Sequence, residues 1–156
     1  MPANVATSLD APPLTLGRLV VLVEDYDAAL AFYRSAFGAR VLFDAPAPAG
    51  GRYLHVGFGM EGDETSAGGS VSAGIWLLRA TGTEGGRVGR QTGGEPLAVF
   101  YTPDVRAAVQ RAQSAGATVV RALDAADGAS FAHVADLYGN VFVLVQMSFE
   151  SASPPA

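Results

Sequence analysis

Two stretches of the chain resemble each other: Asp25-Tyr-Asp-Ala-Ala-Leu-Ala-Phe-Tyr-Arg-Ser-Ala-Phe-Gly38-Ala-Arg-Val41 in the first half and Asp104-Val-Arg-Ala-Ala-Val-Gln-Arg-Ala-Gln-Ser-Ala-Gly116-Ala-Thr-Val119 in the second. The offset is 79 residues at the two aspartates (25 to 104) and 78 at the two glycines (38 to 116). It is still 78 further on, where Tyr53-Leu-His55-Val matches Phe131-Ala-His133-Val. A match that persists over this much sequence indicates a duplicated structural unit.

Each copy of the repeat predicts a strand followed by a helix. Residues 19–23 and 97–102 are short apolar runs rich in β-branched and aromatic side chains, which is typical of strands. In each copy an aspartate then caps a stretch with apolar residues at helical spacing, and a glycine ends it. Three more strands are expected in each copy, at residues 39–45, 52–58 and 72–79 and at residues 118–123, 130–135 and 141–147. The predicted order is β-α-β-β-β, twice, which makes an α+β fold.

Proline and glycine divide the chain around these two units. Residues 1–15 predict a flexible N-terminal arm, and residues 148–156 predict a C-terminal tail. The units then span residues 16–80 and 97–147. Between them, residues 81–96 contain six glycines, which favours a flexible connector over a regular element.

Composition excludes several classes of protein. The chain has 156 residues, of which 49% are hydrophobic, so a folded domain is expected. It has no cysteine and no lysine, which excludes disulfides, thiolate metal sites and Schiff-base chemistry. A formal net charge of −5 argues against nucleic acid or an anionic membrane as a partner. The sequence starts without the features of a signal peptide and has no run of 18 apolar residues, so a cytoplasmic protein is expected.

Two motifs resemble a known superfamily. The segment Val23-Glu-Asp-Tyr-Asp-Ala-Ala-Leu-Ala-Phe-Tyr-Arg, which leads to Gly38, resembles the opening of the vicinal oxygen chelate superfamily. That superfamily includes glyoxalase I, extradiol dioxygenases, fosfomycin-resistance enzymes and bleomycin-resistance proteins. Asp136-Leu-Tyr-Gly-Asn-Val-Phe-Val-Leu-Val-Gln146 resembles its closing signature, Asp-Pro-x-Gly-Asn-x-hydrophobic-Glu-Leu-Val-Gln. Over residues 17–147 the resemblance implies two βαβββ units that form an open barrel-like sheet around a ligand cavity, with the helices outside.

The resemblance also locates the metal positions of the superfamily. Metal-using members carry His or Glu on the first and fourth strands of each unit, pointing into the cavity. The corresponding residues here are Arg18, Trp76, Leu97 and Val143, and none of them is a usual ligand of a divalent cation. We therefore expect no metal and no other cofactor.

His55 and His133 are the only histidines, and the repeat makes them equivalent. Strand alternation turns both toward the cavity, together with Tyr53 and Phe131, if the valines that follow the histidines pack against the helices. There the imidazoles could contact a ligand or transfer a proton. The alternatives are ordinary packing with a hydrogen bond to the backbone, and a two-histidine metal site that lacks an evident third ligand.

Three further residues are candidates for ligand contact. Trp76, the only tryptophan, is either a packing residue of the sheet or a platform on which a planar ligand stacks. Tyr101 has the cavity parity of its strand and offers a phenol either to a ligand or to water. Arg18 either pairs with a carboxylate or phenolate of a ligand or lies at the surface.

The favoured function is a metal-independent small-molecule-binding protein for an aromatic or antibiotic-like ligand, as bleomycin-resistance proteins are. The alternative is a metal-independent isomerase, cyclase or lyase of secondary metabolism that uses His55 or His133 as acid and base. A metal-dependent member with its ligands at other positions is a third possibility, and the sequence leaves enzymatic activity open. Because members of the superfamily often dimerise, side by side or by exchanging units, a homodimer is expected.

Overall fold

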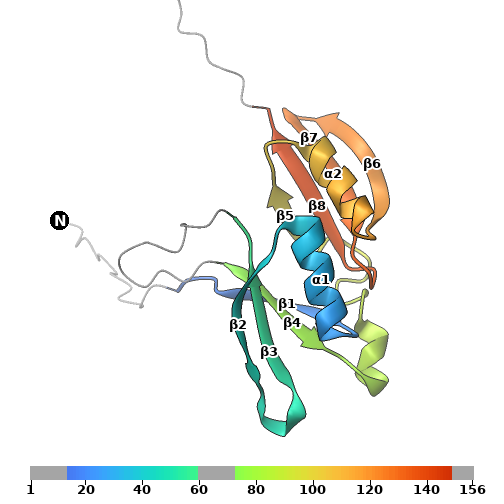
Figure 1. Cartoon of the computed structure of the whole chain (residues 1–156). Helices are drawn as coiled ribbons and strands as arrows, with labels where there is room; N and C mark the ends of the chain where they lie inside the picture. The colour runs from blue at the N-terminus through green and yellow to red at the C-terminus, as the bar shows by residue number, and fades with distance from the viewer. Residues whose placement is uncertain (1–13, 60–72, 149–156) are drawn as a thin grey trace, which may run out of the picture.

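The computed structural model describes residues 14–59 and 73–148, and it contains the order β-α-β-β-β twice (Figure 1). The expected N-terminal arm and C-terminal tail lie outside the described residues, except for residues 14, 15 and 148. The first unit consists of β1 (Arg18–Val23), α1 (Tyr26–Phe37), β2 (Arg40–Pro46), β3 (Arg52–Gly57) and β4 (Gly74–Arg79). The second consists of β5 (Ala98–Tyr101), α2 (Val105–Ser114), β6 (Thr118–Ala126), β7 (Ala129–Ala135) and β8 (Val141–Met147).

The strands form two four-stranded sheets, one in each unit. Sheet A has the order β1-β4-β3-β2 and sheet B the order β5-β8-β7-β6, with β1–β4 and β5–β8 parallel and the other pairs antiparallel. Each helix covers one face of its own sheet, and α1 lies beside α2 (Figure 1). The sheets do not close into a barrel, so the expected open α+β architecture is confirmed.

Both helices begin at the predicted aspartates. The Ala28 amide donates a hydrogen bond of 2.7 Å to the Asp25 carboxylate, and the Ala107 amide donates one of 2.9 Å to Asp104. These bonds satisfy amides that have no partner inside the helix. Helix α1 ends at Gly38, whose φ of 67° lies in the left-handed region that glycine adopts without strain.

The core lies between each helix and its sheet. Val21, Leu54 and Leu77 of sheet A are fully buried, as are Val134 and Phe142 of sheet B. Their neighbours along the strands point to the other face, as period-2 alternation requires. The face of each sheet opposite its helix is called the open face below.

A buried polar cluster joins the two units. The Tyr33 hydroxyl on α1 donates a 2.8 Å hydrogen bond to the Asp136 carboxylate, which lies after β7. The Asn140 side chain donates to that carboxylate at 2.9 Å and to the Leu22 carbonyl on β1 at 3.1 Å. The Asn140 and Tyr138 amides donate to the second carboxylate oxygen. Two polar residues of the closing motif therefore fasten the second unit to a helix and a strand of the first.

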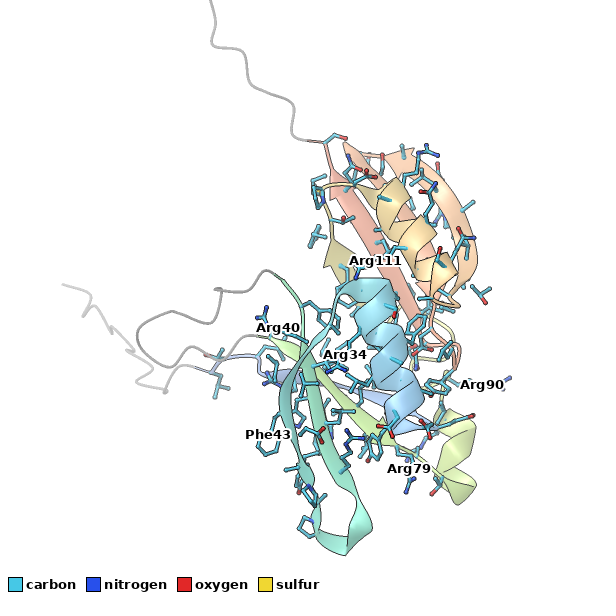
Figure 2. The ribbon with its side chains drawn as sticks, in the orientation of Figure 1. Arg34, Arg40, Phe43, Arg79, Arg90 and Arg111 are labelled. Atoms are coloured by element: carbon cyan, nitrogen blue, oxygen red, sulfur yellow. The ribbon has the colours of Figure 1, made fainter. Side chains whose placement is uncertain are left out.

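The two helices are also linked directly. Figure 2 shows Arg111 of α2 at the C-terminal end of α1. Its guanidinium donates hydrogen bonds to the Ser35 carbonyl at 2.7 Å and to the Arg34 carbonyl at 3.2 Å. A cation at this end satisfies carbonyls that have no partner in the helix and is favoured by the helix dipole.

The connector at 81–96 is more ordered than its glycine content indicates. It contains a 3-10 helix, η2 (Gly82–Arg87), and turns after it. The Gln91 side chain accepts a hydrogen bond from the Leu22 amide and donates one to the Val20 carbonyl, both at 2.8 Å. A side-chain amide has the same donor and acceptor as a peptide, so Gln91 continues the ladder at the edge of β1.

Strand β6 runs to Ala126, which is three residues beyond the predicted end. Asp127 and Gly128, with φ of 50° and 73°, form the turn to β7. An Asp-Gly pair is a strong hairpin signal, so the sequence did contain the correct boundary.

In the described residues no helix has both the length and the apolarity needed to cross a bilayer.

Candidate functional site: the open faces of the two sheets

Four side chains form a row across the open face of sheet A. Phe43 lies opposite His55, His55 lies opposite Trp76, and Trp76 lies beside Val20, so the row contains one residue from each strand. The ring centroids of Phe43 and His55 are 5.5 Å apart, and those of His55 and Trp76 are 5.6 Å apart. Phe43 points away from α1 (Figure 2). The row is called the aromatic row below.

Two more of the expected residues adjoin the aromatic row. The Tyr53 ring lies 5.8 Å from the Trp76 ring. Burial lowers the pKa of His55 from its usual 6.5, and the positive charge of Arg18 lowers it further. His55 is therefore mostly neutral at pH 7, with one ring nitrogen as a donor and the other as an acceptor.

Two nitrogens of the aromatic row lack hydrogen bonds. Nε2 of His55 and Nε1 of Trp76 are both covered by neighbouring atoms and have no hydrogen-bond partner in the part of the chain that the structure describes. Buried polar atoms in folded proteins are nearly always paired. The aromatic row thus combines apolar rings with unused hydrogen-bonding capacity.

The open face of sheet B carries the equivalent residues in a more polar setting. His133 lies opposite Arg121, and the Arg121 guanidinium lies 5.0 Å from the centroid of the Phe131 ring. Arg121 also pairs with Asp124 at 3.1 Å. Tyr101, at the end of β5, is 73% exposed beside an open depression of about 500 Å³.

The expected site residues therefore fall into two groups. Arg18, Tyr53, His55 and Trp76 are on sheet A, whereas the other three are on sheet B, namely Tyr101, Phe131 and His133. In residues 14–59 and 73–148 the strands pair only within their own sheet, so one chain presents the two groups on separate open faces. A single pocket lined by both groups stays a prediction.

The residues at the metal positions do not fit a metal site. Arg18 and Trp76 lie on β1 and β4, Val143 lies on β8, and Leu97 directly precedes β5. None of these side chains is a usual ligand of a divalent cation. Residues 14–59 and 73–148 contain no group of three or more His, Asp or Glu side chains that could hold an ion.

Phe43 and Arg121 were missed in the sequence because each follows a β-bulge. The register shifts between Val41 and Phe43 in β2 and between Val119 and Arg121 in β6, so the bulge occurs at equivalent positions of the repeat. A bulge inserts a residue and breaks the alternation on which the assignment of faces rests. The signal that could have found these residues was the repeat, which aligns Phe43 with Arg121.

Two glycines lie next to the bulge in β2. The side chain of Leu42 lies against Gly57 and Gly74, and a Cβ at either glycine would come within 3.1 Å of it. The paired glycines leave room for the bulged leucine at the end of the sheet next to Arg18 and Arg40.

The sequence that folds into these two units matches a known protein family. The family model of the Glyoxalase/Bleomycin resistance protein/Dioxygenase superfamily matches residues 15–144. The chain belongs to this superfamily. A search of curated protein sequences finds no match.

Solved structures of similar proteins agree with this family. TnmS3, an antibiotic binding protein from Streptomyces sp. CB03234, is 25% identical with a TM-score of 0.66, over 88% of this chain and 99% of that one. A glyoxalase/bleomycin resistance protein from the same organism is 25% identical with a TM-score of 0.60, over 83% and 98%. UcmS2 shares the fold at 23% identity with a TM-score of 0.69, over 86% and 98%.

Proposed function

We propose that this protein binds a small aromatic, antibiotic-like molecule on the open face of sheet A, without a metal. The observation that carries the proposal is the aromatic row with its two unpaired nitrogens, because apolar rings with a few polar atoms are the usual lining of ligand sites. The similarity to TnmS3, an antibiotic binding protein, supports the same class of ligand.

We propose further that the working form is a homodimer. Large apolar side chains are exposed on both open faces, among them Phe43 on sheet A and Val99, Tyr101 and Met147 on sheet B. Contiguous exposed apolar surface marks interaction sites. A second copy that lays its sheet B over sheet A would join the two groups of site residues in one cavity.

The dimer is tested by measuring the molar mass in solution by light scattering. Val99→Arg places a charge in the expected interface and should yield monomers. Leu137→Arg is the matched control, because Leu137 is 45% exposed in the turn after β7, away from the open faces. A monomeric wild type would contradict the proposed dimer.

Ligand binding is tested with planar aromatic antibiotics such as doxorubicin, tetracycline and novobiocin. Trp76 is the only tryptophan, so any quenching of tryptophan fluorescence comes from the aromatic row. Stacking contributes about 0.5–1.5 kcal/mol beyond burial of area, so Trp76→Ala should weaken binding several-fold or more in equilibrium dialysis. Leu137→Ala should leave the affinity unchanged. Equal affinities of wild type and Trp76→Ala would contradict the proposed site.

A metal-independent enzyme is the second candidate, and the neutral imidazole of His55 favours it. A neutral histidine with an unpaired ring nitrogen can act as a general base. For a converted substrate, His55→Gln should lower turnover by about 10²–10⁴-fold, whereas in a binding protein it should change affinity only modestly. Leu137→Gln, in the turn after β7 and away from the open faces, is the control and should leave turnover unchanged.

A further inference from the structure

The unpaired nitrogens of His55 and Trp76 lie on rings that face each other across two antiparallel strands. The two residues are directly opposite in the β3–β4 register, with ring centroids 5.6 Å apart and ring planes at 58°. Both rings are partly exposed, although the two nitrogens are covered. The χ2 torsion of such rings is broad and roughly two-fold, so either ring can turn without a movement of its strand.

Neither nitrogen has a hydrogen-bond partner among the described residues. The Phe43 ring on the other side of His55 has no polar atom, and Val20 beside Trp76 is apolar. The equivalent histidine of sheet B does not share this property, because no ring nitrogen of His133 is buried and unpaired. The unmet hydrogen bonds are therefore specific to sheet A and do not come simply from the repeat.

The chemistry of the two groups determines what can satisfy them. An indole nitrogen can only donate, so its partner must be an acceptor. An acceptor that also contacts His55 selects the tautomer with the proton on Nε2. A positive charge acts on this part of the face, because Arg18 acts electrostatically on His55, and among the described strand residues of sheet A none on the open face is acidic.

We propose that Trp76 Nε1 and His55 Nε2 jointly donate hydrogen bonds to the acceptor oxygens of the ligand, and that this ligand is a planar aromatic molecule carrying a carboxylate or a comparable oxygen anion at its edge. This inference rests on the proposed binding function and names its class of ligand. A preference for an anionic ligand is the opposite of what the net charge of −5 by itself favours, which is a cation. Salt screens exposed charges beyond about 8–10 Å, so a charge close to the rings weighs more than the net charge of the chain.

Three probes of one shape separate the ligand classes: 2-naphthoate, the uncharged 2-vinylnaphthalene and the cationic 2-naphthylmethylammonium. We expect 2-naphthoate to bind about tenfold or more tightly than either of the others, since hydrogen bonds to a charged acceptor are about twice as strong as neutral ones. In a ¹⁵N–¹H spectrum the single indole N–H signal should shift on addition of 2-naphthoate and much less with 2-vinylnaphthalene.

Two variants assign the preference to His55. His55→Phe keeps a ring but removes the donor, so the preference for 2-naphthoate should fall to within about twofold. Leu137→Phe, in the turn after β7 and away from the open faces, should leave the preference unchanged.

Equal binding of 2-naphthoate and 2-vinylnaphthalene, or a preference for the cation, would overturn this inference and leave the proposed binding function standing. Failure of all three probes to shift the indole signal would overturn this inference, and failure of the aromatic antibiotics as well would overturn both.

Discussion

Replacing Asp136 by alanine tests whether the buried polar cluster fastens the two units together. The carboxylate accepts four hydrogen bonds, of 2.8 Å from the Tyr33 hydroxyl and 2.9 Å from the Asn140 side chain, the Asn140 amide and the Tyr138 amide. Asp136 is 4% exposed and Tyr33 is fully buried, so water cannot replace the lost acceptor without opening the core.

The cost of the change follows from the donors that it leaves unpaired. A buried donor without a partner costs about 1–3 kcal/mol. The Tyr33 hydroxyl and the Asn140 backbone amide are the two buried donors for which no other acceptor is described, since the Asn140 side chain also donates to the Leu22 carbonyl. Asp136→Ala should therefore lower the free energy of unfolding by about 2–6 kcal/mol, a large share of the about 5–15 kcal/mol typical of a domain. Tyr33→Phe removes one bond to a charged group and leaves no unpaired donor, so about 1.5–3 kcal/mol is expected.

Equilibrium unfolding in urea measures these changes, and a double-mutant cycle isolates the contact. The double variant should be less destabilised than the sum of the single variants, because Tyr33→Phe removes a donor that Asp136→Ala leaves unpaired. Asp124→Ala, at an exposed ion pair, is the control and should cost less than about 1 kcal/mol. If Asp136→Ala does not fold, Tyr33→Phe still tests the cluster. A change below about 0.5 kcal/mol in Tyr33→Phe, or strict additivity in the cycle, would refute the reasoning.

Three other changes have defined outcomes. Gln91→Ala leaves two backbone groups of β1 without partners and should cost about 1–3 kcal/mol in urea unfolding, whereas Thr92→Ala should cost less. Folding lowers the pKa of His55, so the His55 side chain binds a proton more readily in the unfolded chain than in the folded one. The stability that comes from neutral His55 is therefore present above about pH 6.5 and is lost as pH falls through the pKa of the folded protein. His55→Gln should flatten this part of the pH profile, and an unchanged profile would contradict it. Burial, and then the charge of Asp136, raises the pKa of Tyr33 well above 10.0. The stability that comes from the protonated Tyr33 hydroxyl is therefore lost as pH rises beyond about 10. Because Tyr33 does not ionise near pH 10 in the native protein, the phenolate absorbance that develops there should be the same in wild type and Tyr33→Phe.

The repeat predicted the fold because it carries local signals that depend on short-range physics. The aspartate caps, the glycine after α1 and the alternation of the strands each act within a few residues, and they gave the element order and the buried faces. The orientation of His55 and His133 follows from the same alternation, because Val56 and Val134 beside them are fully buried.

The features that sequence reasoning missed depend on contacts between distant residues. Gln91 lies 69 residues from Leu22, and only the folded chain brings its amide to the edge of β1. The bulges in β2 and β6 shift the strand register and so place Phe43 and Arg121 on the open faces. The division of the site residues between two sheets likewise depends on how the units pack, and a pattern within one unit does not contain it.

The most direct measurement of ligand binding at the aromatic row is a crystal structure of the protein with the aromatic antibiotic that binds it best. We expect the ring system of the ligand to lie on the open face of sheet A, with heavy atoms within about 4 Å of Trp76 and an acceptor oxygen within hydrogen-bond distance of the indole nitrogen. A ligand that instead occupies the groove between α1 and α2, which Ala31, Ser35 and Arg111 line, with the aromatic row uncovered, would contradict the proposed site.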